Sequence, residues 1–248
     1  MKKEKKRLDA LVLEKNPKFS RNQVQSWILQ RKVEVNGKVV DKPGTLITTD
    51  SNLVLRVEEP KYVSRAGLKL EKALENFKVD VKGLVVLDSG ISTGGFTDCL
   101  LQHGAKKVYG VDVGYGQVHE KVLNNKKLVL MERTNLRKLE RLPEQVDLVT
   151  LDLSFISLLK VMPAISKLLK SDGKVITLIK PQFEAERKDI ARGGVVKDES
   201  VYPKVIEKIK VGMTEFGFEM VEVIESPILG AKSGNKEFLA LFIKSERF

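Results

Sequence analysis

Four charged side chains that lie far apart in the sequence occur where they could act together on a bound molecule. They are Lys69, Asp152, Lys180 and Glu237. Asp152 and Lys180 each follow an apolar run that predicts a buried strand, so both should project from the carboxyl edge of a parallel sheet. Lysines and carboxylates gathered at such an edge can orient a hydroxyl group and accept its proton. The alternative for each residue alone is a surface salt bridge, which is the commoner fate of lysine and glutamate.

Neighbouring elements place the other two members of this set. Lys69 lies in the first turns of a helix predicted over residues 65–77, which should point toward the same edge. Glu237 directly precedes the last predicted strand, 238–243, which begins at that edge if it runs antiparallel to the others. Lys180 is the candidate base or orienting group. Lys69 and burial would favour its neutral form and the two acids its charged form, and the sequence leaves the balance open.

A glycine-rich turn follows the first predicted strand of this sheet. Its glycines are spaced Gly-x-x-x-Gly-Gly from Gly90 to Gly95, and Asp112 ends the next strand about 20 residues on, where it can bind ribose hydroxyls. A nicotinamide enzyme would favour Gly-x-Gly-x-x-Gly, which seats a pyrophosphate that S-adenosylmethionine lacks. The spacing therefore favours a methyl donor over a nicotinamide cofactor, and the paired Asp112 argues against the alternative that these glycines only turn the chain. We expect the cofactor site to comprise Asp88, Gly90, Ser92, Thr93, Gly94, Gly95, Phe96 and Asp112.

Strands and helices alternate from Arg65 onward. Buried apolar runs predict strands at 85–88, 108–113, 128–131, 146–151, 175–179, 218–224 and 238–243. Helical patterns fall between them, at 65–77, from 96 to 104, at 158–169 and at 201–215. Such alternation is typical of an α/β fold whose mostly parallel sheet is covered on both faces and binds ligands at its carboxyl edge.

A shorter α+β pattern precedes this domain. Helices are predicted at 7–15 and 21–30, Asn36-Gly37 predicts a hairpin turn between strands near 33–35 and 39–40, and 46–47 and 53–57 add further strand. Trp27 lies on the apolar stripe of the second helix, so we expect its side chain in the core rather than stacked on a nucleic-acid base.

The charge balance indicates a polyanionic partner. The chain carries a formal net charge of +11, and its first 60 residues hold 13 Lys and Arg against 8 Asp and Glu, compared with 31 against 25 in the other 188. Positive potential of this size attracts nucleic acid, although an anionic membrane surface would also fit. A hydrophobic content of 42% with 31% charged residues is typical of a globular protein with a real core.

Other classes of protein are disfavoured. No stretch approaches the roughly 20 apolar residues that span a bilayer, and the lysine run from Met1 to Lys6 has no apolar signal segment behind it. We therefore expect a cytoplasmic protein without membrane contact. Cys99 is the single cysteine, and His103 and His119, expected at the surface, are the only histidines, so we expect neither a disulfide nor a metal site.

The first 60 residues resemble a known RNA-binding module. The run Arg7-Leu-Asp, the pair Ser20-Arg and the run Val33-Glu-Val-Asn-Gly-Lys are similar to the small domain named after ribosomal small-subunit protein four, called here the S-four domain. The resemblance implies that the second helix and the turn after it face RNA. The residues it assigns to this role are Arg21, Gln25, Arg31, Lys32 and Lys38. Taken singly, each could also be an ordinary solvated side chain.

Five further motifs resemble the hemolysin A (TlyA) family, which belongs with the FtsJ-like ribose methyltransferases and carries an S-four domain in front. They are Asp88-x-Gly-x-Ser-Thr-Gly-Gly-Phe-Thr-Asp, Val111-Asp-Val-Gly-Tyr-Gly-Gln, Asp152-Leu-Ser-Phe-Ile-Ser, Lys180-Pro-Gln-Phe-Glu and Gly234-Asn-x-Glu. The resemblance implies a Rossmann-like class I methyltransferase with a mostly parallel seven-stranded sheet. It further implies that the four charged residues catalyse 2'-O-methylation of cytidine in ribosomal RNA, with S-adenosylmethionine as donor. Ser89 and Ile91 depart from the family pattern, and Ile91 would narrow the cofactor loop.

We therefore expect an S-four-type domain over residues 1–59, a linker at 60–64 and the methyltransferase domain over 65–248, with ribosomal RNA or ribosomal subunits as partner. The charged loop 182–194 could close over RNA or the donor, or be a mobile surface loop. A non-catalytic RNA-binding or ribosome-assembly factor and a membrane-active hemolysin are the rival functions. The intact charged set argues against the first, and the lack of an apolar spanning run argues against the second.

Overall fold

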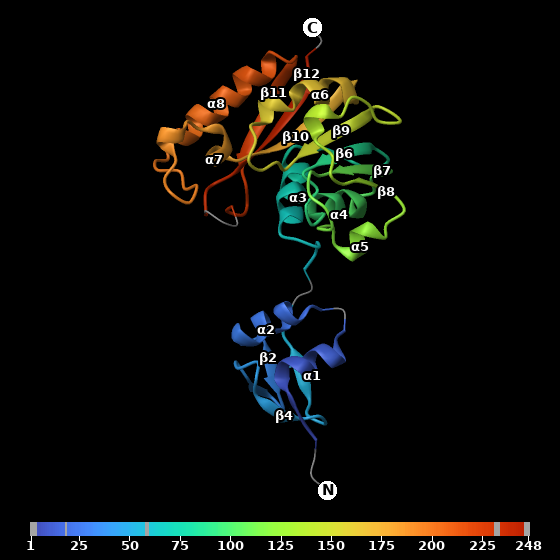
Figure 1. The fold of residues 1–248 in the computed structure, drawn as a ribbon, viewed down its shortest axis with the longest axis vertical. Helices are drawn as coiled ribbons and strands as arrows, with labels where there is room; N and C mark the ends of the chain where they lie inside the picture. The colour runs from blue at the N-terminus through green and yellow to red at the C-terminus, as the bar shows by residue number, and fades with distance from the viewer. Residues whose placement is uncertain (1–3, 18, 58–59, 231–233, 246–248) are drawn as a thin grey trace. The chain divides into compact units, whose positions relative to one another are not determined.

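The computed structural model describes residues 4–17, 19–57, 60–230 and 234–245 of the 248-residue chain. The chain forms two compact units, residues 1–59 and residues 60–248 (Figure 1). Among the residues described, every helix falls short of the length and hydrophobicity that a transmembrane span requires.

The N-terminal unit packs two helices against short strands. In chain order its elements are β1 (Lys5–Arg7), α1 (Leu8–Lys15), α2 (Arg21–Leu29), β2 (Val33–Val35), β3 (Lys38–Val39), β4 (Leu46–Thr48) and β5 (Leu53–Leu55). β1 pairs with β4, and β2 lies between β3 and β5, all antiparallel. Ser20 and Gln23 form a capping box that starts α2. Asn36 and Gly37 have the positive φ values, 51° and 77°, that the predicted hairpin turn requires.

Apolar side chains from both helices and from β2 form the core of this unit. The buried members are Leu8, Val12, Val24, Ile28, Val33 and Val35. Trp27 is partly buried against this core, and its ring meets the Phe19 ring nearly edge-on with 4.8 Å between centroids. Trp27 is therefore a packing residue, as predicted.

A buried carboxylate joins β1 to the two helices. The Asp9 side chain has no exposed surface, and its oxygens accept hydrogen bonds from Arg7 Nε at 2.9 Å, Arg7 Nη2 at 2.8 Å and Gln25 Nε2 at 2.8 Å. Arg21 Nη2 lies 3.5 Å from the same carboxylate. The hydrogen bonds from Arg7 hold the pKa of Asp9 well below its usual range. Asp9 thus fixes three polar side chains of this unit.

The larger unit is built on a seven-stranded sheet in the order β11-β12-β10-β9-β6-β7-β8. Its strands are β6 (Val85–Ser89), β7 (Lys107–Val111), β8 (Leu128–Met131), β9 (Val146–Leu151), β10 (Leu169–Ile179), β11 (Phe218–Glu225) and β12 (Phe238–Lys244). β6 to β10 pair in parallel, and β12 runs antiparallel to both β10 and β11. The α/β fold with a mostly parallel sheet is confirmed.

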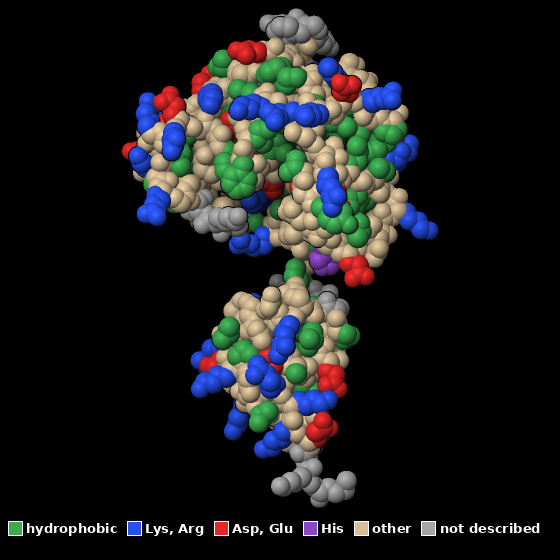
Figure 2. All heavy atoms as spheres, in the orientation of Figure 1, with side chains coloured by type: hydrophobic (Ala, Val, Ile, Leu, Met, Phe, Trp, Pro, Cys, Tyr) green, Lys and Arg blue, Asp and Glu red, His purple; other side chains and the backbone are tan. Residues whose placement is uncertain are grey.

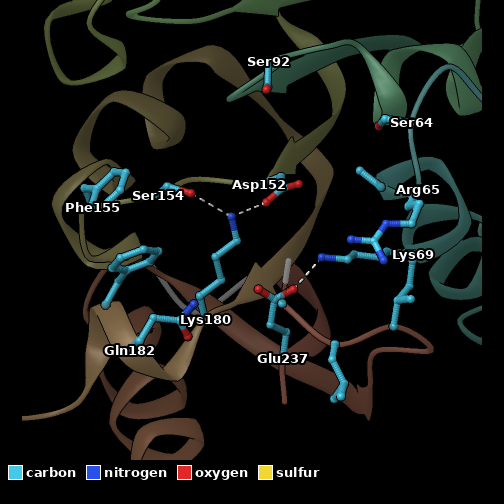
Figure 3. A pocket seen from close by; sticks show the side chains of 15 residues that line it. Ser64, Arg65, Lys69, Ser92, Asp152, Ser154, Phe155, Lys180, Gln182 and Glu237 are labelled. Carbon is cyan, nitrogen blue, oxygen red and sulfur yellow. Dashed lines mark hydrogen bonds and ion pairs between the residues drawn. The ribbon is translucent and has the colours of Figure 1, made fainter. Parts of the chain in front are cut away.

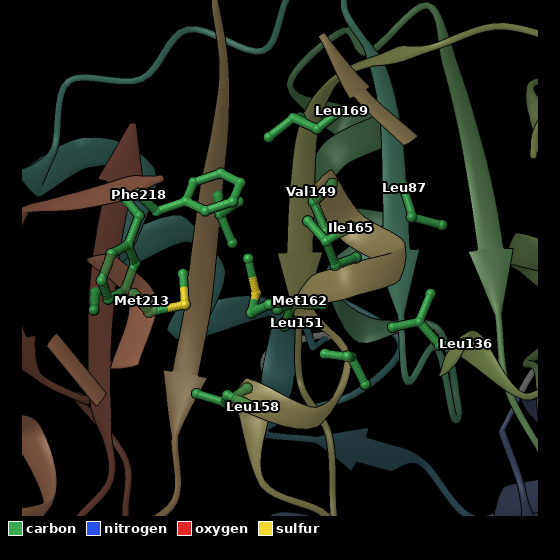
Figure 4. Packing of buried hydrophobic residues seen from close by; sticks show 14 of the residues in the cluster. Leu87, Leu136, Val149, Leu151, Leu158, Met162, Ile165, Leu169, Met213 and Phe218 are labelled. Carbon is green, nitrogen blue, oxygen red and sulfur yellow. The ribbon is translucent and has the colours of Figure 1, made fainter. Parts of the chain in front are cut away.

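Helices cover both faces of this sheet (Figure 1). They are α3 (Ala66–Asn76), α4 (Gly95–Gln102), α5 (Glu120–Leu123), α6 (Met162–Leu168), α7 (Pro181–Glu184) and α8 (Val201–Thr214), with 3-10 turns η1 (Leu136–Lys138), η2 (Leu158–Lys160) and η3 (Arg187–Asp189). Successive strand residues point to opposite faces, so Val86 packs with α3 and α4 whereas Leu87 lies in the core with α6 and α8. Figure 4 shows the core that contains Leu87, to which Met162, Ile165 and Phe218 also belong.

One predicted helix is divided in the structure. The sequence predicts a single helix over 158–169, but the chain forms η2, then α6, and enters β10 at Leu169. Pro163 accounts for the break, because it has no N–H to donate to Leu159 and its ring disrupts a continuous helix. β10 is correspondingly longer than the predicted strand, with a register shift between Leu169 and Lys174.

Residues 60–64, expected to be a linker, fall within the larger unit, and Tyr62 and Val63 are bonded to α3 and α4. Tyr62 is buried, and its hydroxyl donates to Glu71 at 2.8 Å. The Val63 N–H donates to Asp98 at 2.9 Å. A side chain on Gly67 would collide with the Tyr62 ring, so glycine is required for this contact. The segment is a fixed part of the larger unit.

We expect Asp9→Ala to destabilise the N-terminal unit by about 2 kcal/mol, because Arg7 and Gln25 lose their hydrogen bonds to a charged group. Trp27 is the chain's single tryptophan and lies in this unit, so its fluorescence in urea follows this unit's unfolding. Glu14→Ala, which removes an exposed ion pair with Lys6, is the control and should change the unfolding free energy by less than about 0.5 kcal/mol. Equal urea midpoints for Asp9→Ala and the unsubstituted protein would contradict this role.

The depressed pKa of Asp9 also predicts a pH dependence. Its stabilisation is complete above the ordinary aspartate pKa of about 3.9 and is lost as the pH falls toward the lower folded value, because the unfolded chain takes up the proton first. The urea midpoint reported by Trp27 should therefore fall on acidification below about pH 4, and fall less in Asp9→Asn. The same acid sensitivity in both proteins would rule out Asp9 as its source.

Candidate active site

Two ion pairs line a cavity of about 410 Å³ at the carboxyl edge of the sheet (Figure 3). Lys69 Nζ lies 2.5 Å from Glu237 Oε2, and Lys180 Nζ lies 2.5 Å from Asp152 Oδ1. The four side chains are between 4% and 17% exposed, so each charge is largely removed from water and depends on its partner. The structure thus brings together the four charged residues that the sequence places at strand and helix ends.

Each of the four is held by a different element. Lys69 projects from the first turns of α3, and Asp152 follows β9. Lys180 stands between β10 and α7, and Glu237 precedes β12. β12 is antiparallel to β10, and its Phe238 pairs with Ile179. The next pair in this register is therefore Lys180 with Glu237. The direction of β12 is therefore what delivers Glu237 to the edge where β9 and β10 end.

The Lys180 ammonium makes a second contact. Its Nζ donates a hydrogen bond to Ser154 Oγ at 3.0 Å. The contact with Asp152 is a charge contact rather than an aligned hydrogen bond, since Asp152 Oδ1 has no hydrogen-bond partner among the described residues. At least one N–H group of Lys180 therefore donates to a group other than Asp152, namely the Ser154 hydroxyl.

A second cavity, of about 620 Å³, lies at the glycine turn. Gly90 has a φ of 81°, and a Cβ there would come 2.5 Å from the Asp152 carbonyl oxygen, so the turn approaches β9 as only glycine can. Asp112 accepts hydrogen bonds from the N–H groups of Ser92 at 2.8 Å and Gly114 at 2.7 Å, which fixes its carboxylate at the cavity wall. Further lining residues are Ser89, Val111, Val113, Gln117, Asn135, Leu136, Leu153 and Ile156.

Other residues that we assigned to the cofactor lie away from this cavity. Asp88 is fully buried, accepts hydrogen bonds from the Thr97 and Thr150 hydroxyls at 2.6 and 2.8 Å, and has its pKa raised by burial to about 6. Phe96 is buried in the core with α3 and α4. The residues of the assigned set that do not line the cavity are Asp88, Thr93, Gly94, Gly95 and Phe96. They form the turn and its support, whereas Gly90, Ser92 and Asp112 face the cavity.

The expectation that Ile91 narrows the cofactor loop is wrong. Ile91 is 3% exposed and lines neither cavity. Its side chain packs on Gly110, where a Cβ would lie 2.5 Å from Ile91 Cδ1. The missing side chain at Gly110 makes the room for Ile91. Ser89, the other departure from the family pattern, does line the glycine-turn cavity.

Sequence reasoning missed two residues at the site. Ser154 contacts Lys180, and Phe155 is 82% exposed with a φ of 65°. Both line both cavities. They belong to the motif that begins at Asp152, and a serine and an aromatic residue directly after the candidate acid were the available signal.

The candidate RNA-binding side chains lie on the surface of the N-terminal unit. Arg21 and Gln25 meet at Asp9 on the α1–α2 face. Arg31, Lys32 and Lys38 are exposed, with Arg31 Nη1 4.0 Å from Asp41. Figure 2 shows Lys and Arg side chains over this unit and over the larger one.

The charged loop 182–194 is held to the segment that carries Glu237. Asn235 is buried, accepts a hydrogen bond from Val196 N–H at 3.0 Å and donates one to Gly194 O at 2.7 Å. Ile190 and Val196 form a bridge that closes a small hairpin. Its basic residues, Arg187, Lys188 and Arg192, remain exposed.

No group of three or more His, Cys, Asp or Glu side chains that could hold a metal ion occurs in the described part of the chain. Cys99 is buried, and its Sγ lies 3.6 Å from His103 Nδ1.

Known proteins resemble this chain over nearly its whole length. Hemolysin A of Brachyspira hyodysenteriae is 44% identical over 96% of this chain and 99% of its own. The 16S/23S rRNA (cytidine-2'-O)-methyltransferase TlyA of Mycobacterium tuberculosis is 38% identical over 97% of this chain and 91% of its own. The solved structure of a Streptococcus thermophilus protein named for hemolysin superposes with a TM-score of 0.76 at 40% identity, covering 98% of this chain and 89% of that one.

Both units also match defined families. Residues 6–53 match the S4 domain, and residues 62–244 match the FtsJ-like methyltransferases. Because the second match spans well over half of the chain and includes all four charged residues of the cavity, this protein belongs to the FtsJ-like methyltransferase family and carries an S4 domain in front.

Proposed function

We propose that this protein transfers a methyl group from S-adenosylmethionine to the ribose 2'-hydroxyl of a cytidine in ribosomal RNA. The observation that carries the proposal is that the cavity with the two ion pairs shares a wall with the glycine-turn cavity. The residues common to both are Ser92, Asp152, Ser154 and Phe155. A donor in one cavity and a hydroxyl in the other would meet at this wall. The Mycobacterium tuberculosis relative, named for the same reaction, supports the choice of substrate.

The glycine-turn cavity fits S-adenosylmethionine. Asp112 is the acid that would hold the ribose hydroxyls of the donor, and Val113, Leu136 and Ile156 supply apolar surface for its adenine. Gly90 leaves room for close approach to the backbone. When bound, S-adenosylmethionine supplies an electrophilic methyl group on a positively charged sulfur.

The Lys180–Asp152 pair would hold the nucleophile. A ribose hydroxyl attacks poorly until its proton is removed, so a group at the hydroxyl must accept that proton. In the proposed step the hydroxyl proton would pass to a carboxylate oxygen of Asp152 while the Lys180 ammonium holds the hydroxyl oxygen, and S-adenosylmethionine would supply the methyl group that replaces the proton and would leave as the neutral thioether. Ser154 fixes the direction of the ammonium, and the Lys69–Glu237 pair orients the sugar from beside it. Alignment of this kind accounts for a large part of enzymatic rate enhancement.

Phe155 is placed to receive the base. A bulky residue with positive φ and an exposed ring is unusual in a folded protein, and this one stands at the border of both cavities. Bases that leave the stack for chemistry are held on aromatic faces. We therefore place the cytidine ring against Phe155.

The N-terminal unit would bind the surrounding RNA. Arg21, Arg31, Lys32 and Lys38 carry exposed charge suited to phosphates, and Gln25 is fixed by Asp9. A ribosomal RNA substrate implies that the enzyme works in the cytoplasm.

Lys180→Ala is expected to fold and to bind S-adenosylmethionine, but to lower the methylation rate by about 10²–10⁴-fold, the usual contribution of a side chain that takes part in positioned proton transfer. The assay follows a labelled methyl group into unmodified ribosomal subunits, with ribose methylation mapped afterwards. Lys72→Ala removes an exposed lysine of α3 and serves as the control. Near-normal turnover by Lys180→Ala would remove Lys180 from the mechanism.

Gly90→Ala should weaken S-adenosylmethionine binding by at least about tenfold, because the new methyl group overlaps the Asp152 carbonyl and displaces the shared wall. Gly83→Ala is a matched control, since Gly83 has a similar φ of 78° but open space around it. Calorimetric titration with S-adenosylmethionine measures both. Equal affinities for the two variants would place the donor elsewhere.

A further inference from the structure

The loop after β9 and the turn after β10 are joined at several points. We call residues 152–158 the β9 loop and residues 180–184 the β10 turn. At one end of the contact Lys180 reaches the start of the β9 loop. In the middle, the rings of Phe155 and Phe183 lie 5.1 Å apart at an angle of 51°. Two segments far apart in the sequence therefore form one wall of the site, as Figure 3 shows for the labelled Phe155 and Lys180.

Glu184 makes a third connection. It is 2% exposed, and its Oε1 accepts a hydrogen bond from the Leu158 N–H at 2.7 Å. Leu158 begins η2, and Ser157, the residue at its N-cap, makes no side-chain capping bond. Glu184 therefore supplies, from 26 residues away, the cap that the β9 loop lacks.

The environment of Glu184 does not favour a carboxylate. Its Oε2 is buried without a hydrogen-bond partner in the described ranges, and burial raises the pKa of this group. A side chain needed only to fill this space would be better apolar, because a buried and half-satisfied carboxylate is costly. The hydrogen bond from Leu158 N–H and the charges of Lys208 and Lys160 are what favour an acid here, and of these only the hydrogen bond ties Glu184 to the β9 loop.

The β9 loop needs such an anchor. Its first residue is fixed by the hydrogen bond from Asp152 N–H to Ser89 O at 3.1 Å. Between this point and Leu158, Phe155 adopts a positive φ and keeps its ring exposed. A strained conformation of this kind costs about 1–3 kcal/mol and persists only when the surrounding structure holds it.

We propose that Glu184 is a positioning residue for methyl transfer, which holds Ser154 and Phe155 at the shared wall through the backbone of Leu158. The inference rests on the proposed function, since it names a residue that supports the same site. Glu184 touches neither of the two cavities, so its effect on the reaction passes through the β9 loop.

The test compares three variants in the ribosomal-subunit methylation assay. Glu184→Ala removes the acceptor and should lower kcat/KM for the subunits by about 10²-fold, the effect of a misplacement of about 1 Å at a reacting centre. Glu184→Gln keeps an acceptor of the same length and should restore activity close to that of the unsubstituted enzyme. Glu186→Ala, which removes an exposed acid paired with Lys188, should leave activity unchanged.

A double substitution separates positioning from simple stabilisation. Phe155→Ala should lower kcat/KM, and adding Glu184→Ala to it should cost less than Glu184→Ala costs in the unsubstituted enzyme, because part of its effect passes through Phe155. Losses that multiply in the double variant would overturn the inference, as would normal kcat and KM in a Glu184→Ala enzyme that circular dichroism shows to be folded. If Glu184→Ala does not fold, Glu184→Asp carries the same test, since it keeps the charge but withdraws it from Leu158.

The unsubstituted enzyme separates the two proposals. Absence of ribose methylation by it would refute the proposed function, whereas normal methylation with no difference between Glu184→Ala and Glu184→Gln would refute the role of Glu184 alone.

Discussion

The pairing of charges that are largely removed from water is the constraint on which the site depends. An unpaired lysine or acid in such a place costs several kcal/mol, so Lys69 needs Glu237 and Lys180 needs Asp152. That requirement fixes where α3, β9, β10 and β12 must begin or end. The sheet order meets it because β12 lies beside β10 and runs in the opposite direction. The arrangement of strand ends in this fold is thus what brings the paired charges of the site together.

The β9 loop connects the paired charges to both cavities of the site. Asp152, Ser154 and Phe155 of the β9 loop border both cavities, one of which we assign to a nucleoside donor and the other to a ribose hydroxyl. Transfer between two ligands requires that their reacting atoms be held in line, and a loop held at both ends is a means of doing so. The same loop also supplies the exposed ring of Phe155 and the Ser154 hydroxyl that accepts a hydrogen bond from Lys180.

The alternation of elements and the strand-end charges could be read from the sequence because both follow from periodicity. The break between η2 and α6 lies beside Pro163, so the sequence did contain a signal for it, although the apolar pattern alone indicates one helix. Other features depend on contacts between distant segments. Asp88 stands in a cofactor motif, yet its side chain turns to Thr97 and Thr150. The capping of Leu158 by Glu184 leaves no local pattern, since the two are 26 residues apart.

The sequence separation of Lys69 and Glu237 has a consequence for the folding of the newly synthesised chain. Its members are separated by 168 positions in the chain, so one is synthesised long before the other. Contacts of such separation carry a large loop-closure entropy, which the rest of the fold must offset. A nascent chain that has folded only as far as β10 holds an uncompensated ammonium group at Lys69 and an incomplete pocket. Catalytic competence therefore depends on β12, and damage to that strand should abolish activity even where the rest of the sheet survives.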